Sequence, residues 1–405
     1  MKVLQINATW GRGSTGKIVR DIQQISTSEG VDSYVAYSLT TQRDVPNGYH
    51  VGNFVDAKSH ALLSRLHGCQ AYFSSCSTRR FLHWMDKLQP DVVHLHNLHS
   101  NYINLNMLLS YLAEHNIRTI ITMHDCWYFT GGCFHYVSVG CEKWKRGCHD
   151  CQKHDTPAWF GDSSQQIWSD RLRYLRAIPR LTVVGCSEWI AGEAAKSPVL
   201  EGRDIRTIYN GFDLNIFRPS TPKTEKIQSL LSVASGRHII LGPATKWLSD
   251  INAETFNYFA SHLPQDNILV LFGGGGGGMT LPKNVISFGF TSDADELAQL
   301  YSVADVMVNC SREDTLSSIN IECQACGTPV VTYDATGLKE TVDNSVSVAV
   351  KTGDYKALLD ATFTILSQSR DINVLTDWVT SKFEKGKNYK KYMDLYHEQR
   401  IESES

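Results

Sequence analysis

The sequence has no apolar run of the length that a membrane-spanning helix needs. A bilayer is crossed by roughly 20 consecutive apolar residues, and every apolar run in this chain of 405 residues is clearly shorter. The first residues also lack the basic, apolar and small-residue order of a secretion signal, because Met1 leads directly into the strand-like residues 2–7. These two absences predict a cytoplasmic protein.

Charge of one sign is not in excess either. The chain has 39 Lys and Arg against 42 Asp and Glu, a formal net charge of -3. Nucleic-acid-binding domains usually carry a strongly basic face, so the composition predicts no nucleic-acid partner. Hydrophobic residues at 42% and charged residues at 20% are typical of a soluble globular protein.

The length is too great for one ordinary hydrophobic core and favours two domains of roughly 200 residues each. Short apolar runs alternate with amphipathic stretches in both halves, which is typical of parallel sheets covered by helices. Expected strands lie at residues 3–6, 34–37, 92–96 and 119–123, then 239–242, 267–272, 285–288, 306–309 and 329–333. The pattern predicts an α/β fold with two Rossmann-like domains.

A turn signal separates the two halves. Asn210 and Gly211 form a dipeptide that favours turns, and Pro219 limits helix formation shortly afterwards. We therefore expect one domain at residues 1–208 and a second at residues 209–385.

A glycine-rich stretch follows the first expected strand and opens a helix. Residues 11–17, called the glycine loop below, read GRGSTGK, and backbone amides at such a helix start attract phosphate. A nucleoside-triphosphate loop needs Ser or Thr after the lysine, whereas this chain has Ile18. We favour a loop that contacts donor phosphate or acceptor through Gly13; a tight packing turn and a true triphosphate loop are the alternatives.

The most informative stretch spans residues 311–331 and combines a strand end, an acidic segment, a short helix and the next strand. Ser317 or Ser318 is suited to cap the helix, and Gly327 is suited to end it. Asp314 then precedes the helix and Glu322 lies within it. Carboxylates accept hydrogen bonds from sugar hydroxyls, and a helix start supplies amides for phosphate.

This stretch resembles the hallmark of the retaining glycosyltransferases of family 4. Asp314 is followed by seven residues, Glu322 and an Ala-Cys-Gly-Thr-Pro-Val-Val run. The resemblance implies the GT-B fold, in which two Rossmann-like domains face each other across a cleft. It also implies that Asp314 contacts the donor sugar, that Glu322 contacts the ribose, and that the backbone of Leu316, Ser317 and Ser318 holds the diphosphate.

The chain departs from that family pattern at two places. The family more often has Glu where this chain has Asp314, so Glu313 is the alternative donor contact. A later Lys-Gly pair that usually binds the diphosphate is missing, and Lys246, after the strand expected at 239–242, is the substitute candidate. An ordinary surface lysine is the alternative interpretation.

Histidines gather after two expected strands of the first half. His94 and His96 point the same way along an extended strand, and either a metal pair or packed, hydrogen-bonded rings fits that spacing. The resemblance implies that His96, Asn97 and His99 line the acceptor site. It also places His124 beside the reacting sugar, as a catalytic-site residue.

What the family does is carried over as an expectation. The resemblance implies front-face transfer without an enzymic nucleophile and without a catalytic metal. It is closest to transferases of bacterial exopolysaccharide, capsule, O-antigen and colanic acid. The expected partners are a nucleotide-sugar donor and a polyprenyl-diphosphate-linked glycan acceptor. A C-terminal helix in residues 386–405 is expected to pack on the first domain.

Basic and apolar side chains share a helical region at residues 58–87, a combination suited to anionic membrane. We therefore expect contact with the inner face of the cytoplasmic membrane, with an ordinary solvated face as the alternative.

Eleven cysteines are many for a reducing compartment. Cys133, Cys141, Cys148 and Cys151 lie in a polar insertion at about residues 131–155, and four soft ligands suit tetrahedral zinc. A closed set of four ligands predicts a structural metal site rather than a catalytic one. Two disulfides or free thiols are the alternatives, and the nearby histidines that are able to replace a ligand are His135, His149 and His154.

Two other functions remain open beside glycosyl transfer. A nucleotide-dependent phosphotransferase would use the glycine loop with magnesium. A noncatalytic, zinc-stabilised glycan-binding module would bind a nucleotide-sugar without turnover.

Overall fold

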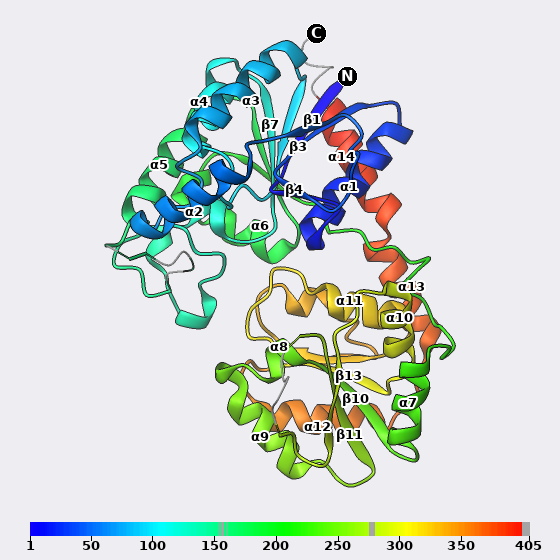
Figure 1. The fold of residues 1–405 in the computed structure, drawn as a ribbon. Helices are drawn as coiled ribbons and strands as arrows, with labels where there is room; N and C mark the ends of the chain where they lie inside the picture. Colours follow the sequence, from blue (N-terminus) through cyan, green and yellow to red (C-terminus); the bar gives the residue numbers. More distant parts are fainter. Residues whose placement is uncertain (154, 156–157, 160, 275–279, 399–405) are drawn as a thin grey trace. The chain divides into compact units, whose positions relative to one another are not determined.

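The computed structural model describes residues 1–398 except residues 154, 156–157, 160 and 275–279, and it divides into two compact units (Figure 1). Unit 1 comprises Met1–Asn210 and Gly386–Ser405, and unit 2 comprises Gly211–Lys385. Each unit has a parallel sheet with helices on both faces, so the predicted α/β class with two Rossmann-like domains is confirmed.

Within the described residues, the main sheet of unit 1 has seven strands in the order β5-β3-β1-β6-β7-β8-β9. Their bounds are β1 Lys2–Ile6, β3 Asp32–Tyr37, β5 Gly48–His50, β6 Val92–Leu95, β7 Arg118–Met123, β8 Leu181–Gly185 and β9 Asp204–Thr207. Every residue of β6, β7 and β8 is buried, as expected for parallel strands covered on both faces.

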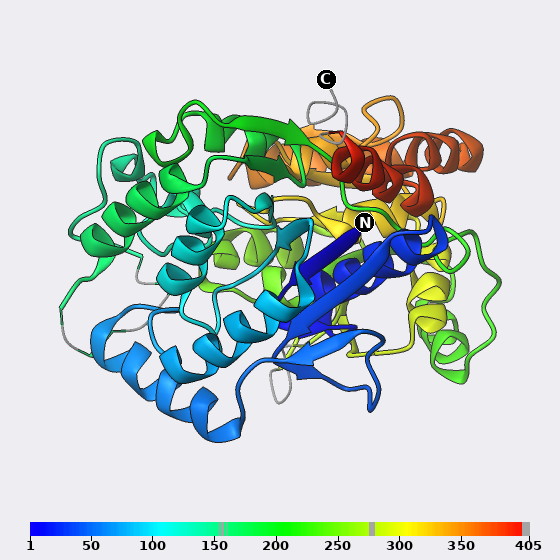
Figure 2. The same cartoon turned by 90° about the horizontal axis from the view of Figure 1, so that it is seen from above.

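Two helices from opposite ends of the chain cover one face of this sheet. These are α1 (Gly13–Ser28) and α14 (Lys385–His397), which lie side by side in Figures 1 and 2. Tyr389, Tyr392 and Tyr396 of α14 are buried in one hydrophobic cluster with Ile18 and Ile22 of α1. The helices α3 (Ser75–Leu88), α4 (Leu105–Glu114) and α5 (Ser164–Ala177) lie on the other face.

Within the described residues, the sheet of unit 2 has six parallel strands in the order β12-β11-β10-β13-β14-β15. Their bounds are β10 His238–Pro243, β11 Asn267–Phe272, β12 Val285–Gly289, β13 Val306–Asn309, β14 Val330–Tyr333 and β15 Val348–Val350. Side chains alternate between two cores: Ile239 and Leu241 pack in one cluster, and Ile240 packs in the other.

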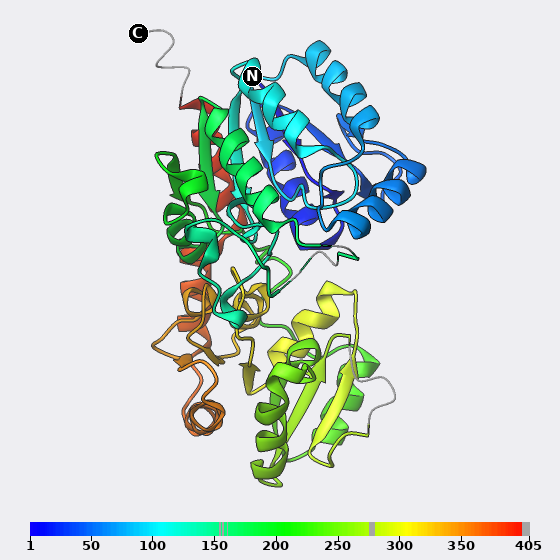
Figure 3. The same cartoon turned by 90° about the vertical axis from the view of Figure 1, so that its left-hand side faces the viewer.

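Helices of unit 2 cover both of those cores. The first cluster holds α7 (Glu225–Ala234), α10 (Ala294–Val303) and α11 (Ser318–Ala325), and the second holds α9 (Ala253–His262) and α12 (Tyr355–Leu366). Figure 3 shows α7 and α9 on opposite sides of the strands. The loops at the carboxyl ends of parallel strands usually carry the ligand site, and most predicted site residues of both units lie on such loops.

Candidate functional site

The acidic loop, residues 310–317, is held in shape by one buried asparagine at the end of β13. Asn309 is only 2% exposed, and its Nδ2 donates to Ser317 Oγ (3.1 Å) and to Asn320 Oδ1 (2.9 Å). Its Oδ1 accepts a hydrogen bond from Ser311 N (3.0 Å). Asn309 was not predicted as a site residue, although a polar residue that ends a buried strand was a visible signal.

Asp314 lies in this loop, and its backbone is fixed by one threonine. Thr336 Oγ1 accepts from Asp314 N (2.9 Å) and donates to Asp314 O (2.6 Å). Thr336 itself has a left-handed backbone with φ 50, a conformation that β-branched residues rarely adopt. The Asp314 carboxylate accepts from Leu316 N (3.3 Å) and remains partly exposed. The strained threonine therefore positions the carboxylate-bearing loop.

The helix α11 begins directly after the acidic loop, without a side-chain cap. Ser317 occupies the N-cap position as predicted, but its Oγ accepts from Asn309 and makes no capping bond in the described structure. The first-turn amides of a helix have no intrahelical acceptor. They and the positive end of the helix dipole are suited to an anion. The backbone at Leu316, Ser317 and Ser318 lies at this helix start, and its contact with phosphate stays a prediction.

The second carboxylate of the motif lies on α11 itself. Glu322 is partly exposed, and Tyr301 Oη donates to its Oε2 at 3.3 Å. Glu313 is also partly exposed, and its carbonyl oxygen accepts from Ser311 Oγ at 3.0 Å. Both predicted carboxylates of the loop and the one on the helix are therefore accessible from solvent.

Two cations accompany the acidic loop, one on the helix α8 and one within the loop itself. Lys246 lies on the short helix α8 (Ala244–Trp247) and is partly exposed. Asn252 Nδ2 donates to the Lys246 carbonyl oxygen (3.1 Å), and Asn252 Oδ1 accepts from Arg312 Nε (3.1 Å). Burial raises the pKa of Cys310 to about 12, whereas the positive charges of Lys246 and Arg312 act to lower it. Arg312 was missed in the sequence.

The glycine loop of unit 1 needs glycine at two positions. Gly11 and Gly13 have φ 67 and φ 68, which favours glycine. At a third position, a Cβ on Gly16 would lie 2.6 Å from Thr9 Oγ1, so close packing excludes a side chain there. The helix α1 starts at Gly13 without a side-chain cap in the described structure. The geometry thus contains both the packing turn and the phosphate-accessible helix start that the sequence left open.

His94 is a packed core residue. It is fully buried, its Nδ1 lies 2.8 Å from Tyr396 Oη, and its Nε2 lies 2.7 Å from Thr122 Oγ1. Burial lowers the pKa of His94 to about 3. Both ring nitrogens are therefore occupied, and of the two interpretations the packed, hydrogen-bonded one describes this ring.

His96 does not occupy the place expected of it. The side chain is fully buried, with Nε2 at 3.1 Å from Gln5 Oε1 and Nδ1 at 3.2 Å from His124 Nε2. The predicted direct contact with an acceptor therefore does not fit this geometry, because the strand places the ring beneath the surface. Gln5 was not predicted as a partner. His124 itself is partly exposed, and burial lowers its pKa to about 4.

His99 and Asn97 remain partly exposed beside this group. His99 Nε2 lies 2.8 Å from Asp125 Oδ2, and the amide of Trp127 donates to Asp125 Oδ1 (2.9 Å). Burial alone would raise the pKa of Asp125, but His99 and the Trp127 amide lower it overall. Asp125 therefore orients His99.

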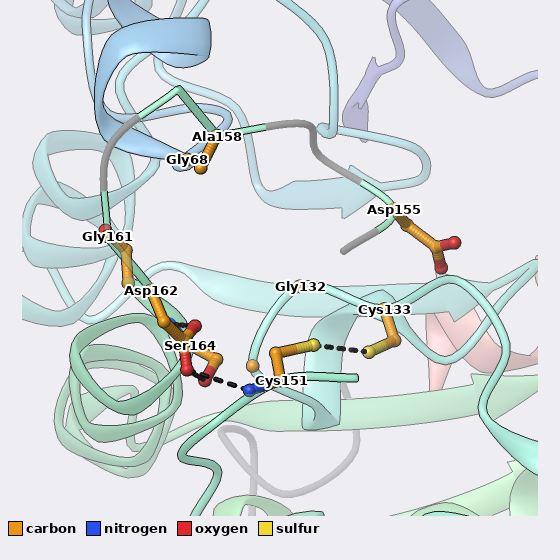
Figure 4. Close-up of a pocket in the computed structure, with 11 residues that line it drawn as sticks. Gly68, Gly132, Cys133, Cys151, Asp155, Ala158, Gly161, Asp162 and Ser164 are labelled. Atoms are coloured by element: carbon orange, nitrogen blue, oxygen red, sulfur yellow. Dashed lines mark hydrogen bonds between the residues drawn. The ribbon is translucent and has the colours of Figure 1, made fainter. Parts of the chain in front are cut away.

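The cysteine loop, residues 131–155, brings two predicted metal ligands together. The sulfur atoms of Cys133 and Cys151 are 3.9 Å apart and line a small pocket, and Cys151 N is hydrogen-bonded to Asp162 (Figure 4). Cys148 Sγ accepts from Gly131 N (3.2 Å). Among the described residues, no disulfide joins any of the four cysteines of the loop, Cys141 included.

The cysteine loop brings two soft ligands together but no complete metal site within the described residues. Two close thiols are the soft ligands that zinc prefers. Within the part of the chain that the structure describes, however, no group of three or more His, Cys, Asp and Glu side chains is arranged to hold a metal ion. Of the alternative ligands, His154 lies outside the described residues, and His149 Nδ1 is 3.0 Å from the Gly147 carbonyl oxygen.

Comparison with known proteins fits this arrangement. A model of "Glycosyltransferase Family 4" matches residues 27–216, and a model of "Glycosyl transferases group 1" matches residues 258–368. The chain is 24% identical over 375 residues to the "Putative colanic acid biosynthesis glycosyl transferase WcaC" of Escherichia coli strain K12. That match covers 85% of this chain and 86% of the relative.

Solved structures share the fold. Sucrose-phosphate synthase from Thermosynechococcus elongatus superposes with a TM-score of 0.66 at 16% identity, and the match covers all of both chains. Alr3699/HepE of Anabaena, solved with UDP-glucose, has a TM-score of 0.62 at 13% identity and covers 98% of this chain and 99% of that one.

The two Rossmann-like units have the GT-B fold, and the family matches show that the chain is a glycosyltransferase. The chain belongs to glycosyltransferase family 4, because the family 4 model and the model of group 1 glycosyl transferases match successive parts that together make up most of it. Among the described residues, every helix is too short or too polar to span a bilayer.

Proposed function

We propose that this chain is a retaining glycosyltransferase that moves a sugar from a nucleotide-sugar to a lipid-linked glycan during bacterial surface polysaccharide biosynthesis. The observation that carries the proposal is the acidic loop, in which a fixed carboxylate precedes an uncapped helix start. The similarity to a colanic acid transferase over most of both chains supports the biosynthetic role.

The donor would be held entirely by unit 2. Asp314, with Glu313 as its alternative, accepts hydrogen bonds from the sugar hydroxyls, and Glu322 accepts those of the ribose. The amides at the start of α11 hold the diphosphate, and Lys246 and Arg312 add positive charge. In this proposal these amides and cations neutralise the charge of the leaving diphosphate.

Unit 1 would supply the acceptor contacts. Asn97 and His99 offer partly exposed polar groups, and His124 offers a ring nitrogen beside them. The glycine loop adds backbone amides at Gly13. Because no carboxylate is assigned as nucleophile, we propose front-face transfer in which the donor phosphate takes the acceptor proton.

The first test is a thermal-shift and turnover screen against UDP-, GDP-, ADP- and CMP-sugars. One nucleotide-sugar is expected to stabilise the protein, and Asp314→Ala and Glu322→Ala are expected to abolish that shift. Asp360→Ala, at an exposed position of α12, is the matched control and should respond like the wild type. Stabilisation by magnesium-ATP alone would instead support the phosphotransferase, and nucleotide-sugar binding without turnover would support a glycan-binding module.

Retention and the acceptor class need separate measurements. The anomeric configuration of the product, followed by NMR from a donor of known configuration, is expected to match that of the donor. An inverted product would refute the retaining mechanism. Transfer to polyprenyl-diphosphate-linked sugars should exceed transfer to the same free sugars, and equal rates would refute a lipid-linked acceptor.

We further propose that the inner membrane surface is met by α2 (Phe54–His67). Phe54, Val55 and Leu62 are 76%, 72% and 51% exposed on this helix, next to the exposed cation Lys58. Apolar and basic groups together suit an anionic membrane. Phe54→Ser should reduce sedimentation with phosphatidylglycerol vesicles, whereas Phe290→Ser, at a 72% exposed position of unit 2, should not. Equal sedimentation of both variants would refute the proposal.

A structural zinc ion is proposed for the cysteine loop. Cys133 and Cys151 already stand 3.9 Å apart. Cys141 and Cys148 are not grouped with them in the described structure and would have to move to complete the set. Purified protein should contain about one zinc per chain, as expected for a four-ligand site. Protein purified without chelator that contains no zinc would refute the site.

A further inference from the structure

Two hydrogen bonds fix the protonation of His96. Gln5 is fully buried, and its Nε2 donates to the carbonyl oxygen of Val19 at 3.2 Å, which orients the amide. Gln5 Oε1 therefore faces His96 Nε2, at 3.1 Å, as an acceptor. An amide oxygen cannot donate, so the proton of His96 sits on Nε2.

The tautomer of His96 determines which nitrogen of His124 carries the proton. The buried His96 ring lies between two other imidazoles, with ring centroids 4.0 Å from His94 and 5.5 Å from His124. Burial and these neighbours lower the pKa of His96 well below its ordinary value, so the ring is neutral. Its Nδ1 is then an acceptor, and the contact of 3.2 Å requires His124 Nε2 to donate.

With the protons placed in this way, His124 Nδ1 has no hydrogen-bond partner among the described residues. If His124 carries its proton on Nε2, its Nδ1 is a bare lone pair. That atom is buried in the free protein and has no hydrogen-bond partner among the described residues. A buried, unsatisfied acceptor costs stability unless a ligand satisfies it.

We propose that Gln5 and His96 are positioning residues that hold His124 as the Nε2–H tautomer, so that its Nδ1 accepts a hydrogen bond from a hydroxyl of the bound substrate. Gln5, His96 and His124 are called the histidine relay below. The hydroxyl partner rests on the proposed glycosyl transfer, whereas the tautomer is a property of the free protein and is testable without any activity.

Replacing the amide by a carboxylate should reverse the relay. A buried carboxylate beside an imidazole favours the imidazolium, so in Gln5→Glu the His96 ring would carry protons on both nitrogens. His96 Nδ1 would then donate, and His124 Nε2 would have to accept. The His124 proton would move to Nδ1, and the lone pair offered to the substrate would be lost.

The charges around His124 do not impose this tautomer by themselves. Asp125 favours and His99 disfavours a charged His124, and both act on its pKa less than burial does. On the side of β6, the neutral rings of His94 and His96 face it. Asp125 is hydrogen-bonded to His99 and to the Trp127 amide, so it is not the partner that selects the His124 nitrogen.

The test is nitrogen-resolved NMR of ring-labelled histidine in the full-length protein, with His124 assigned by comparison with His124→Asn. The wild type is expected to show Nε2–H at His124, and Gln5→Glu is expected to show Nδ1–H. Gln23→Glu is the matched control, because Gln23 is another buried glutamine that accepts from a ring N–H, that of Trp10, and donates to a carbonyl, that of Pro46. It should leave His124 unchanged.

Kinetics provide the second readout. Loss of one substrate hydrogen bond should lower kcat/KM in Gln5→Glu about tenfold, with Gln23→Glu close to the wild type. An Nδ1–H tautomer of His124 in the wild type would overturn the proposal even if Gln5→Glu failed to fold. If the wild type transfers sugar, and Gln5→Glu shows the reversed His124 tautomer but the same kcat/KM as the wild type, the proposed substrate contact is overturned. A correct tautomer in a protein without any transfer activity would instead refute the proposed function.

Discussion

Mild acid should destabilise unit 1 selectively, because its central strands bury histidines in the neutral form. Burial lowers the pKa of His94 to about 3 and that of His124 to about 4, and it lowers that of His96 as well. In the unfolded chain these rings titrate near their ordinary pKa of about 6.5. Below that pH the unfolded state therefore binds more protons than the folded state, so stability is lost as pH falls.

The size of the effect follows from these shifts. At about pH 5, each of His94 and His124 is expected to cost roughly 2 kcal/mol of unfolding free energy relative to neutral pH. His96 adds a loss in the same direction. Small domains have a free energy of unfolding of roughly 5–15 kcal/mol. Unit 1 should therefore come close to unfolding between about pH 4 and pH 5.

Hydrogen exchange by mass spectrometry separates the two units. Protection of the backbone amides of β7 in unit 1 should fall steeply from neutral pH to about pH 5, after correction for intrinsic exchange. Protection of β13 in unit 2 should change little, because His238 and His262, the two histidines of that unit, are exposed. Equal losses in both strands, or none in β7, would refute the burial of neutral imidazoles.

Three further changes test other parts of the structure. Thr336→Ala should raise the donor KM about tenfold through loss of its two bonds to the acidic loop, while Thr336→Ser should keep wild-type kinetics; equal behaviour of both would contradict the argument. Gly242→Ala would place Cβ 2.2 Å from Trp247 Nε1 and should lower the free energy of unfolding by about 1–3 kcal/mol, measured by urea denaturation. Gly192→Ala, at an open helical position, should leave the free energy of unfolding unchanged. Cys151→Ser should lower both zinc content and melting temperature, and a variant that loses neither would speak against a shared site.

Much of the fold was predictable because parallel strands are simple in sequence. Residues 267–272 and 306–309 were predicted with the bounds that β11 and β13 have, since each is a short apolar run between turn residues. The strand β8 was not predicted, although its Leu-Thr-Val-Val-Gly sequence carries the same β-branched signal. The short β5 and β15 have weaker patterns and depend on their neighbours for pairing.

The site was predictable where a motif is local in sequence. Asp314 and Glu322 share one strand–loop–helix segment, so their spacing was readable. The histidine relay was not, because Gln5 lies in β1 and His96 lies directly after β6, 91 residues away, and the two become neighbours only through the pairing of β1 with β6. The same pairing explains why His96 lies beneath the surface. Its backbone amide is hydrogen-bonded to Ile6 O at the end of β1, and the ring that the family resemblance implied as an acceptor contact is buried.

The partnership of His94 with Tyr396 has a consequence for how the protein is made. These residues are 302 positions apart, and Tyr392 reaches Thr122 in the same way. The first unit therefore leaves the ribosome long before the helix that completes its hydrogen bonds exists. Until the second unit has been translated, the face of the central sheet that α14 covers is covered only in part, by α1, so the remainder is accessible to chaperones. Early termination of translation near residue 385 would thus lower the stability of unit 1, at the beginning of the chain, more than that of unit 2.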